Sequence, residues 1–190
     1  MRMMKQAVFG IVLYGMLLIP PVASYMEKVM LVHMLIQLPL LILSGWFIGE
    51  IIIKKYNMFF NKWNKHGVPG ILLVFFITMY CMIPRVLDES LTIASIQAFK
   101  FIGLPLLVGI PLRDSWHKLQ ALGKCFIYLN YLSMFGLMAW LYIDIPIQIC
   151  NNYLEIQQKV LGWTFLFLTV AMAIYLIQVV FTDHTSETRT

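Results

Sequence analysis

Charge is scarce in this 190-residue sequence. Only 12% of its residues are charged, whereas 61% are hydrophobic, and a soluble domain of average composition has about twice that share of charge. Apolar runs follow one another with short polar connections, and the length leaves room for about six spans of about 20 residues. The composition therefore predicts an all-α, polytopic membrane protein without a soluble domain, so any chemistry must lie within helices or at their ends.

The sequence also lacks the local motifs of common enzyme chemistry. It contains no glycine-rich phosphate-binding loop, no H-E-x-x-H and no C-x-x-C. The strong local signals for nucleotide binding and for zinc chemistry are therefore absent. Its four histidines lie on different segments, so histidine alone does not supply two axial haem ligands at one level. The three cysteines show no spacing motif, and a disulfide between Cys81 and Cys150 is the minor alternative. We expect the protein not to be an enzyme.

The apolar runs predict a single transmembrane domain over residues 1–182, followed by a polar tail at 183–190. Six helices are expected, at about residues 6–23, 29–53, 68–83, 91–112, 119–147 and 160–181. The first run carries Arg2 and Lys5 ahead of its apolar segment and small residues near Ala23, so a cleaved signal peptide is the alternative to a retained helix.

Basic residues predict the orientation of these six helices. If the N-terminus is cytoplasmic, ten basic residues lie inside and three outside. The inside set is Arg2, Lys5, Lys54, Lys55, Lys62, Lys65, Arg113, Lys118, Lys124 and Arg189, and the outside set is Lys28, Arg85 and Lys159. This bias predicts a multi-pass protein of the inner (plasma) membrane with both termini cytoplasmic. The basic cytoplasmic loops also explain the net charge of +5, because such loops contact anionic lipid headgroups. We therefore expect no nucleic-acid partner.

One apolar stretch, residues 29–50, carries polar and soft groups in a pattern that suggests a metal site. On a helix, Met30, His33 and Gln37 share one face with Met34 beside them. An imidazole with thioethers suits Cu(I), and Cys81 and Met82 are expected at the same outer level. Pro39 leaves a carbonyl without its helical donor, which favours a helix packed inside protein.

Acidic residues are expected at that same outer end, where they would attract a cation. They are Glu27, Asp88, Glu89, Asp144 and Glu155. The alternative is that His33 only bonds a neighbour and that the methionines, 13 in the whole chain, fill gaps between helices.

Lys100 is the charged residue expected deepest in a span. It lies about ten residues into the fourth expected helix, roughly 15 Å deep, where an unpaired charge costs several kcal/mol. We expect it to point into the bundle or into a partner subunit, with Tyr14, Gln37 or the interrupted backbone near Pro39 or Pro105 as acceptors. Glu50 lies at a different level, and snorkelling to the surface is the alternative.

Four segments resemble motifs of the CtaG family of cytochrome c oxidase assembly factors. HMLIQLPLLILSG (33–45) matches the second half of the family's His-rich helix, and MIPRVLDESL (82–91) matches its turn, with Pro84 and Asp88 in place. QAFKFIGLPLLVG (97–109) is similar to the A-x-E-H helix, and EIQQKVLGW (155–163) to the D-Q-x-x-G-G motif. The resemblance implies a membrane accessory protein of a respiratory or other copper-containing enzyme, with Cu(I) handled at the outer face.

The sequence departs from that family at most of the nitrogen ligands. Val29 stands at the family's first histidine, Cys81 near the tryptophan of its turn, and Lys100 and Phe101 at its Glu-His pair. One consequence is that sulfur replaces imidazole around Cu(I). The other is a chain that keeps the fold as a noncatalytic subunit of a large membrane metalloenzyme after losing the metal site. A small transporter is the third and weakest hypothesis, because no inverted repeat accompanies the interrupted helices.

Overall fold

The computed structural model describes the backbone of residues 2–145 and 150–187, and these residues contain helices but no strand. In chain order the elements are α1 (Arg2–Leu18), α2 (Pro20–Glu27), α3 (Met30–Val32), η1 (His33–Gln37), α4 (Leu38–Lys55), α5 (Asn57–Trp63), α6 (Val68–Met82), α7 (Pro84–Glu89), α8 (Ala94–Ala98), η2 (Phe99–Gly109), α9 (Ile110–Trp116), α10 (Ala121–Asp144) and α11 (Glu155–Glu187), where η marks a π-helical segment. The all-α prediction is confirmed.

Four continuous helical stretches are long and apolar enough to cross a membrane. They are Met30–Lys55, Ala94–Trp116, Ala121–Asp144 and Glu155–Val179. Two bent pairs, α1 with α2 and α5 with α6, raise the number to six if each pair counts as one span. The chain is therefore a multi-pass membrane protein with four to six apolar spans.

Two expected boundaries fall on residues at the edges of the described ranges. The fifth helix ends at Asp144 rather than 147, and residues 146 and 147 lie outside the described part of the chain. The segment expected as a polar tail, 183–190, continues α11 as far as Glu187, and its last three residues lie outside the described part.

The single helix expected at 6–23 is divided into α1 and α2. The chain bends by 71° between α1 and α2, because Pro20 and Pro21 supply no backbone donors and Pro20 restricts the residue before it. Ile19 accordingly has φ −62° and ψ 121°, an extended conformation. This bend turns α2 across the end of the bundle and brings Glu27 towards the helices that follow.

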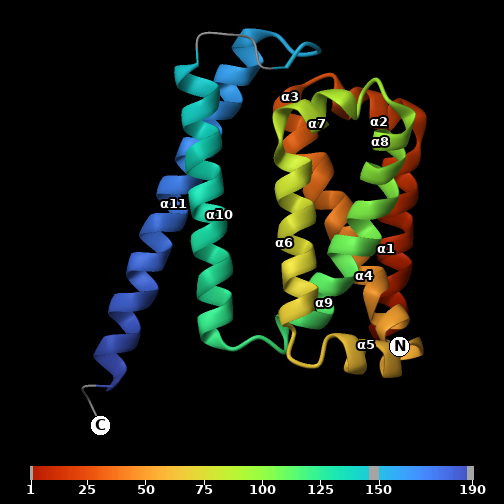
Figure 1. Cartoon of the computed structure of the whole chain (residues 1–190). Helices are drawn as coiled ribbons and strands as arrows, with labels where there is room; N and C mark the ends of the chain where they lie inside the picture. The colour runs from red at the N-terminus through yellow and green to blue at the C-terminus, as the bar shows by residue number, and fades with distance from the viewer. Residues whose placement is uncertain (1, 146–149, 188–190) are drawn as a thin grey trace.

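The elements from α1 to α9 form one helix bundle (Figure 1). The helix α4 lies at its centre, where it packs against α1, η2 and α9. Glycines allow this close packing, since a Cβ on Gly45 would overlap the backbone carbonyl of Pro105, and a Cβ on Gly109 would overlap that of Ile42. Small residues let helix backbones approach closely where no water is available to drive association. The backbones of α4 and η2 are therefore in direct contact at these glycines.

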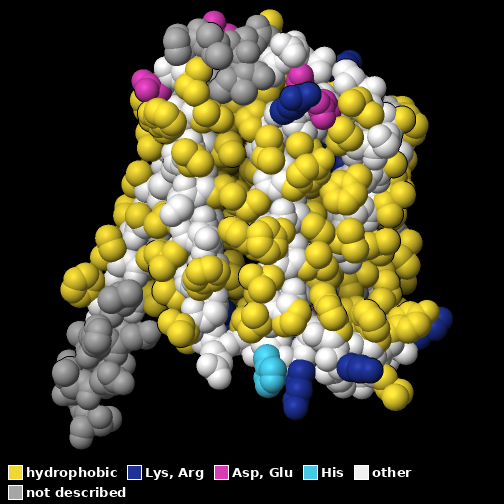
Figure 2. Space-filling view, viewed as in Figure 1, with side chains coloured by type: hydrophobic (Ala, Val, Ile, Leu, Met, Phe, Trp, Pro, Cys, Tyr) yellow, Lys and Arg dark blue, Asp and Glu magenta, His cyan; other side chains and the backbone are white. Residues whose placement is uncertain are grey.

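The helices α10 and α11 form an antiparallel hairpin that stands beside this bundle (Figure 1). It meets the bundle at the end that carries α3 and α7, where α11 packs against α3. The start of α1 and the end of α11 lie at the opposite end of the molecule. Figure 2 shows the acidic side chains at the α3 and α7 end, together with some basic ones. Basic side chains and a histidine lie at the other end, and a hydrophobic band lies between the two.

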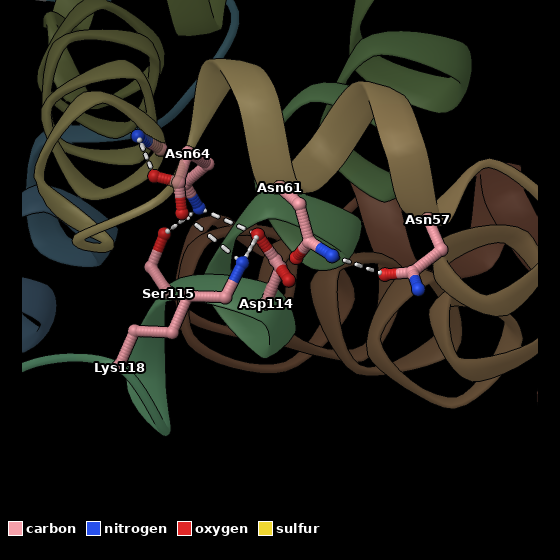
Figure 3. A network of polar contacts seen from close by, with 7 residues as sticks. Asn57, Asn61, Asn64, Asp114, Ser115 and Lys118 are labelled. Carbon is pink, nitrogen blue, oxygen red and sulfur yellow. Dashed lines mark hydrogen bonds and ion pairs between the residues drawn. The ribbon is translucent and has the colours of Figure 1, made fainter.

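A polar network joins α5, α6 and α9 at the basic end (Figure 3). The side-chain amide of Asn64 donates to Asp114 at 2.7 Å and to Ser115 at 2.9 Å, and its oxygen accepts from the backbone of Gly70 at 2.9 Å. The chain turns by 86° between α5 and α6 at Gly67, whose φ of 76° favours glycine. The network fastens α5 under the bundle.

The contact between Gly45 and Pro105 predicts that Gly45→Ala lowers stability. Overpacking at such a site costs about 1–3 kcal/mol, so the unfolding temperature of the purified protein in detergent should fall. Gly15→Ala is the matched control, because no atom lies within 4 Å of a Cβ there and alanine is the better helix former. Equal unfolding temperatures for the two variants would contradict the close packing of α4 on η2.

Candidate functional site

Two π-helical turns place polar side chains inside the bundle. In η1 the backbone N–H of Leu38 donates to the carbonyl of His33, five residues earlier. Pro39 follows directly and Pro105 lies within η2, and a proline removes one helical donor and collides with the carbonyl four residues before it. The wider turn accommodates this loss, and such turns are frequent at functional sites.

Lys100 lies at the centre of a polar cluster formed by Glu27, His33, Lys100 and Tyr153, which we call the outer cluster. Its ammonium is 2.5 Å from Oε1 of Glu27 and 3.3 Å from Nε2 of His33. The side chains of Lys100 and Glu27 are only 5% and 13% exposed, and His33 is fully buried. The ion pair therefore connects α2 to η2 in a place where both charges are largely removed from solvent.

Tyr153 completes the outer cluster from the loop between α10 and α11. Its hydroxyl donates to the backbone carbonyl of Glu27 at 2.8 Å and lies 2.7 Å from Nδ1 of His33. Burial, and then the charge of Glu27, raises the pKa of this phenol, so the hydroxyl keeps its proton. Since it donates to Glu27, it accepts from His33, which assigns the proton of the imidazole to Nδ1 and leaves Nε2 to accept from Lys100.

Asp88 holds the loop that carries Tyr153. Its carboxylate accepts from the backbone N–H groups of Asn151 at 3.2 Å and Asn152 at 2.9 Å, and from the Asn152 side chain at 2.9 Å. Asp88 is therefore a loop anchor rather than an isolated cation ligand.

Cys150 holds the start of the same loop. Burial raises the pKa of Cys150 to about 11, so its protonated thiol donates to the carbonyl of Pro84.

Two glutamines of the last expected motif act at the same place. Gln157 accepts from the backbone N–H of Met30 at 3.3 Å, and Gln158 donates to the carbonyls of Cys150 and Tyr153 at 3.3 and 3.4 Å. Glu155 instead pairs with Lys159 on the surface at 2.6 Å. The hairpin is thus tied to the outer cluster by amides, while Glu155 stands apart from it.

Gln37 lies on η1 four residues after His33. It is fully buried, and neither amide atom has a hydrogen-bond partner within the described ranges. An unpaired buried amide costs about 1–3 kcal/mol. Gln37 is therefore the position inside this bundle where a hydrogen-bonding molecule would add stability.

The sulfur residues separate into two places. Met34, Cys81 and Met82 line one cavity of about 160 Å³, together with side chains of α10 such as Tyr131 and Phe135. His33 and Met30 do not line this cavity, and an ammonium occupies the Nε2 side of His33. Among the described residues, no three His, Cys, Asp or Glu side chains are grouped as a metal site. The expected ligand set is thus divided: Met34, Cys81 and Met82 line this cavity, His33 belongs to the outer cluster, and Met30 is in neither set.

The prediction that Lys100 points into the bundle is confirmed by its 4% exposure, but the expected acceptors Tyr14 and Gln37 were wrong. The estimated depth was too large, because the continuous helix begins at Ala94 and Lys100 is its seventh residue, about 9 Å from the start. At this smaller depth the ammonium of Lys100 lies level with the carboxylate of Glu27, which it contacts. Sequence reasoning treated Glu27 as one outer acid among five and missed Tyr153, although a single deep lysine calls for an acid at its own level.

Comparisons with protein-family models, curated proteins and solved structures found no match to this chain.

The buried ion pair predicts that Lys100→Met is strongly destabilising. Removing one partner of a buried pair costs about 3–5 kcal/mol, and the double variant Glu27→Gln, Lys100→Met should recover part of that loss because no unpaired charge remains. Thermal unfolding of the purified variants measures both effects.

Lys159→Met provides the control for this cycle. Its partner Glu155 lies at a similar distance, but the two side chains are 49% and 58% exposed, so the change should cost at most about 1 kcal/mol. Similar losses in Lys100→Met and Lys159→Met would show that the outer cluster is not a buried ion pair in the membrane.

Proposed function

We propose that this chain is a multi-pass accessory protein of a membrane oxidase or another copper-containing membrane enzyme, similar in role to CtaG-type cytochrome c oxidase assembly factors. One observation carries the proposal: the four segments that resemble that family meet around the loop of residues 150–154. His33 contacts Tyr153, Lys100 contacts His33, Asp88 holds Asn152, and Gln158 donates to the carbonyl of Tyr153.

The chemistry of the outer cluster supports an accessory role rather than catalysis. Lys100 donates to Glu27 and His33, and His33 donates to Tyr153, so these groups satisfy one another and present no unoccupied acid, base or nucleophile. The cluster instead holds α2, η1, η2 and the 150–154 loop in one arrangement. A partner enzyme would then meet a preformed surface at this end of the protein.

The proposal includes six spans with both termini cytoplasmic in the inner membrane. The start of α1 and the end of α11 lie at one end of the molecule (Figure 1), as an even number of spans requires. The basic residues that end α4, together with Lys62 and Lys118, lie at that same end, which agrees with the positive-inside rule. The outer cluster would then lie on the periplasmic or extracellular side.

Affinity purification from the native membrane tests the accessory role. A haem- or copper-containing enzyme should copurify with the wild-type chain, and Asp88→Ala should reduce that copurification several-fold because the 150–154 loop loses its anchor. Glu155→Ala, which changes an exposed acid at the same end, should leave it unchanged. Absence of any metalloenzyme in the purified material would contradict the proposal, whereas equal losses in both variants would contradict the role of the loop.

Copper handling is a second candidate, favoured by the three sulfur side chains that line one cavity. Thioether and thiolate groups suit Cu(I) in two- or three-coordinate sites. The cavity is lined by η1 and α4, by α6 and by α10, so Met34, Cys81 and Met82 would hold the ion between the bundle and the hairpin.

Metal analysis under reducing conditions decides this second candidate. Cys81→Ser, Met82→Leu should abolish stoichiometric copper binding, and Cys125→Ser, Met58→Leu, which changes an exposed cysteine and an exposed methionine, should retain it. His33→Ala tests whether the imidazole joins the sulfur ligands. Copper-free wild-type protein, or equal copper in both double variants, would reject the site.

A further inference from the structure

A charged cleft of about 310 Å³ opens at the basic end, between the last turns of α4 and α9. Its lining consists of Glu50, Ile53, Lys54, Arg113, Asp114, His117 and Lys118. It lies at the opposite end of the molecule from the outer cluster, and the proposed function does not use it.

The acids of this cleft are turned inward and are already neutralised. Glu50 accepts from Arg113 at 2.7 Å, and Asp114 accepts from Lys118 at 2.7 Å. Lys54 also pairs with Glu50, at the longer distance of 3.6 Å. The side chains of Glu50 and Asp114 are 19% and 5% exposed, whereas that of Lys54 is 59% exposed. Solvent therefore meets mainly cationic nitrogen in this cleft.

The charge of the lining favours one small anion. Three cations and two carboxylates leave 3 − 2 = +1 with His117 neutral, so a group with one negative charge balances the cleft. The carboxylates of Glu50 and Asp114 stay in the lining of the cleft, because Arg113 and Lys118 hold them by ion pairs. Lys54, His117 and Lys118 are the residues on its more exposed side that can donate hydrogen bonds.

The cleft is built rather than incidental. Arg113 donates to the backbone carbonyl of Trp46 at 2.8 Å and to Gln6 at 3.4 Å. Lys118 also donates to the carbonyl of Asn64 at 3.0 Å, within the network of Figure 3. The basic groups are thus held in position before any ligand arrives, which lowers the entropy cost of binding.

The cleft also lies at the level where phosphate is abundant. It is formed where two membrane-length helices end, at Lys55 and Trp116, and the Lys124 ammonium lies 5.5 Å from the ring centroid of Trp116. Tryptophan and lysine together mark the membrane interface, and basic pockets between helices there bind anionic headgroups.

We propose that this cleft binds a phosphate group of single negative charge through Lys54, His117 and Lys118. The two sources of that chemistry are the phosphodiester of an anionic phospholipid and a soluble phosphate. Arg113 keeps its contacts to Glu50 and Trp46 and acts as the fixed floor of the site.

Binding to the full-length protein in phosphatidylcholine nanodiscs tests the proposal, with phosphatidylglycerol in the disc or inorganic phosphate in solution as the probe. Lys54→Gln, His117→Gln should weaken phosphatidylglycerol binding about fivefold or more, the effect of one basic residue near the surface. Native mass spectrometry counts the bound lipid, and unfolding temperature reports phosphate.

The matched control is Lys62→Gln, His66→Gln, which removes one lysine and one histidine exposed at the same end but outside the cleft. It should keep wild-type binding. A response to phosphatidylglycerol alone assigns a lipid, and a response to inorganic phosphate assigns a soluble ligand. Equal weakening in both double variants would reduce the effect to general surface attraction and overturn the site, as would the absence of both responses.

Discussion

A lysine ammonium inside an apolar helix bundle has to be paired, and much of this structure depends on how Lys100 meets that constraint. Its partner Glu27 comes from a helix that reaches it only because the chain bends by 71° at the two prolines. His33 and Tyr153 then complete the hydrogen bonds, since a buried pair is stable only when its remaining donors and acceptors are satisfied. One buried charge thus links α2, η1, η2 and the loop that carries Tyr153.

Proline and glycine make this arrangement possible in a chain that cannot use loops within the apolar band. Pro39 and Pro105 accompany the two π-helical turns, and Gly45 and Gly109 let those same segments touch through their backbones. Irregular backbone is tolerated at membrane depth only where protein surrounds it. The pairing of the two irregular helices is therefore a condition for either of them to be stable.

The two ends of the molecule differ in chemistry and in what they offer to partners. The acidic end gathers the outer cluster and the 150–154 loop, where polar groups satisfy one another and define a surface. The basic end keeps its carboxylates inward and presents Lys54 and His117 outward, at the level of phospholipid headgroups. This organisation agrees with the two proposals, an accessory role at the acidic end and a phosphate site at the basic end.

The sequence by itself determined the class of this protein, because composition and apolar run lengths reflect the membrane as a solvent and need no tertiary contact. It also predicted that Lys100 points inward, since the cost of an exposed charge in lipid is independent of the partner. The bend before Pro20 follows from local proline chemistry, although one helix was expected over residues 6–23.

Only the tertiary structure decided which groups meet. Glu27, Lys100 and Tyr153 are separated by at least 50 residues in sequence, so no local pattern relates them, and a shift of three residues in a helix start was enough to assign the wrong acceptors. Likewise Met34, Cys81 and Met82 share a cavity that His33 does not line, because consecutive residues of a helix do not face the same neighbour. The π-helical segment at 33–37 also departs from the expected α-helical period. Helical periodicity places residues on a face only while the helix keeps its period.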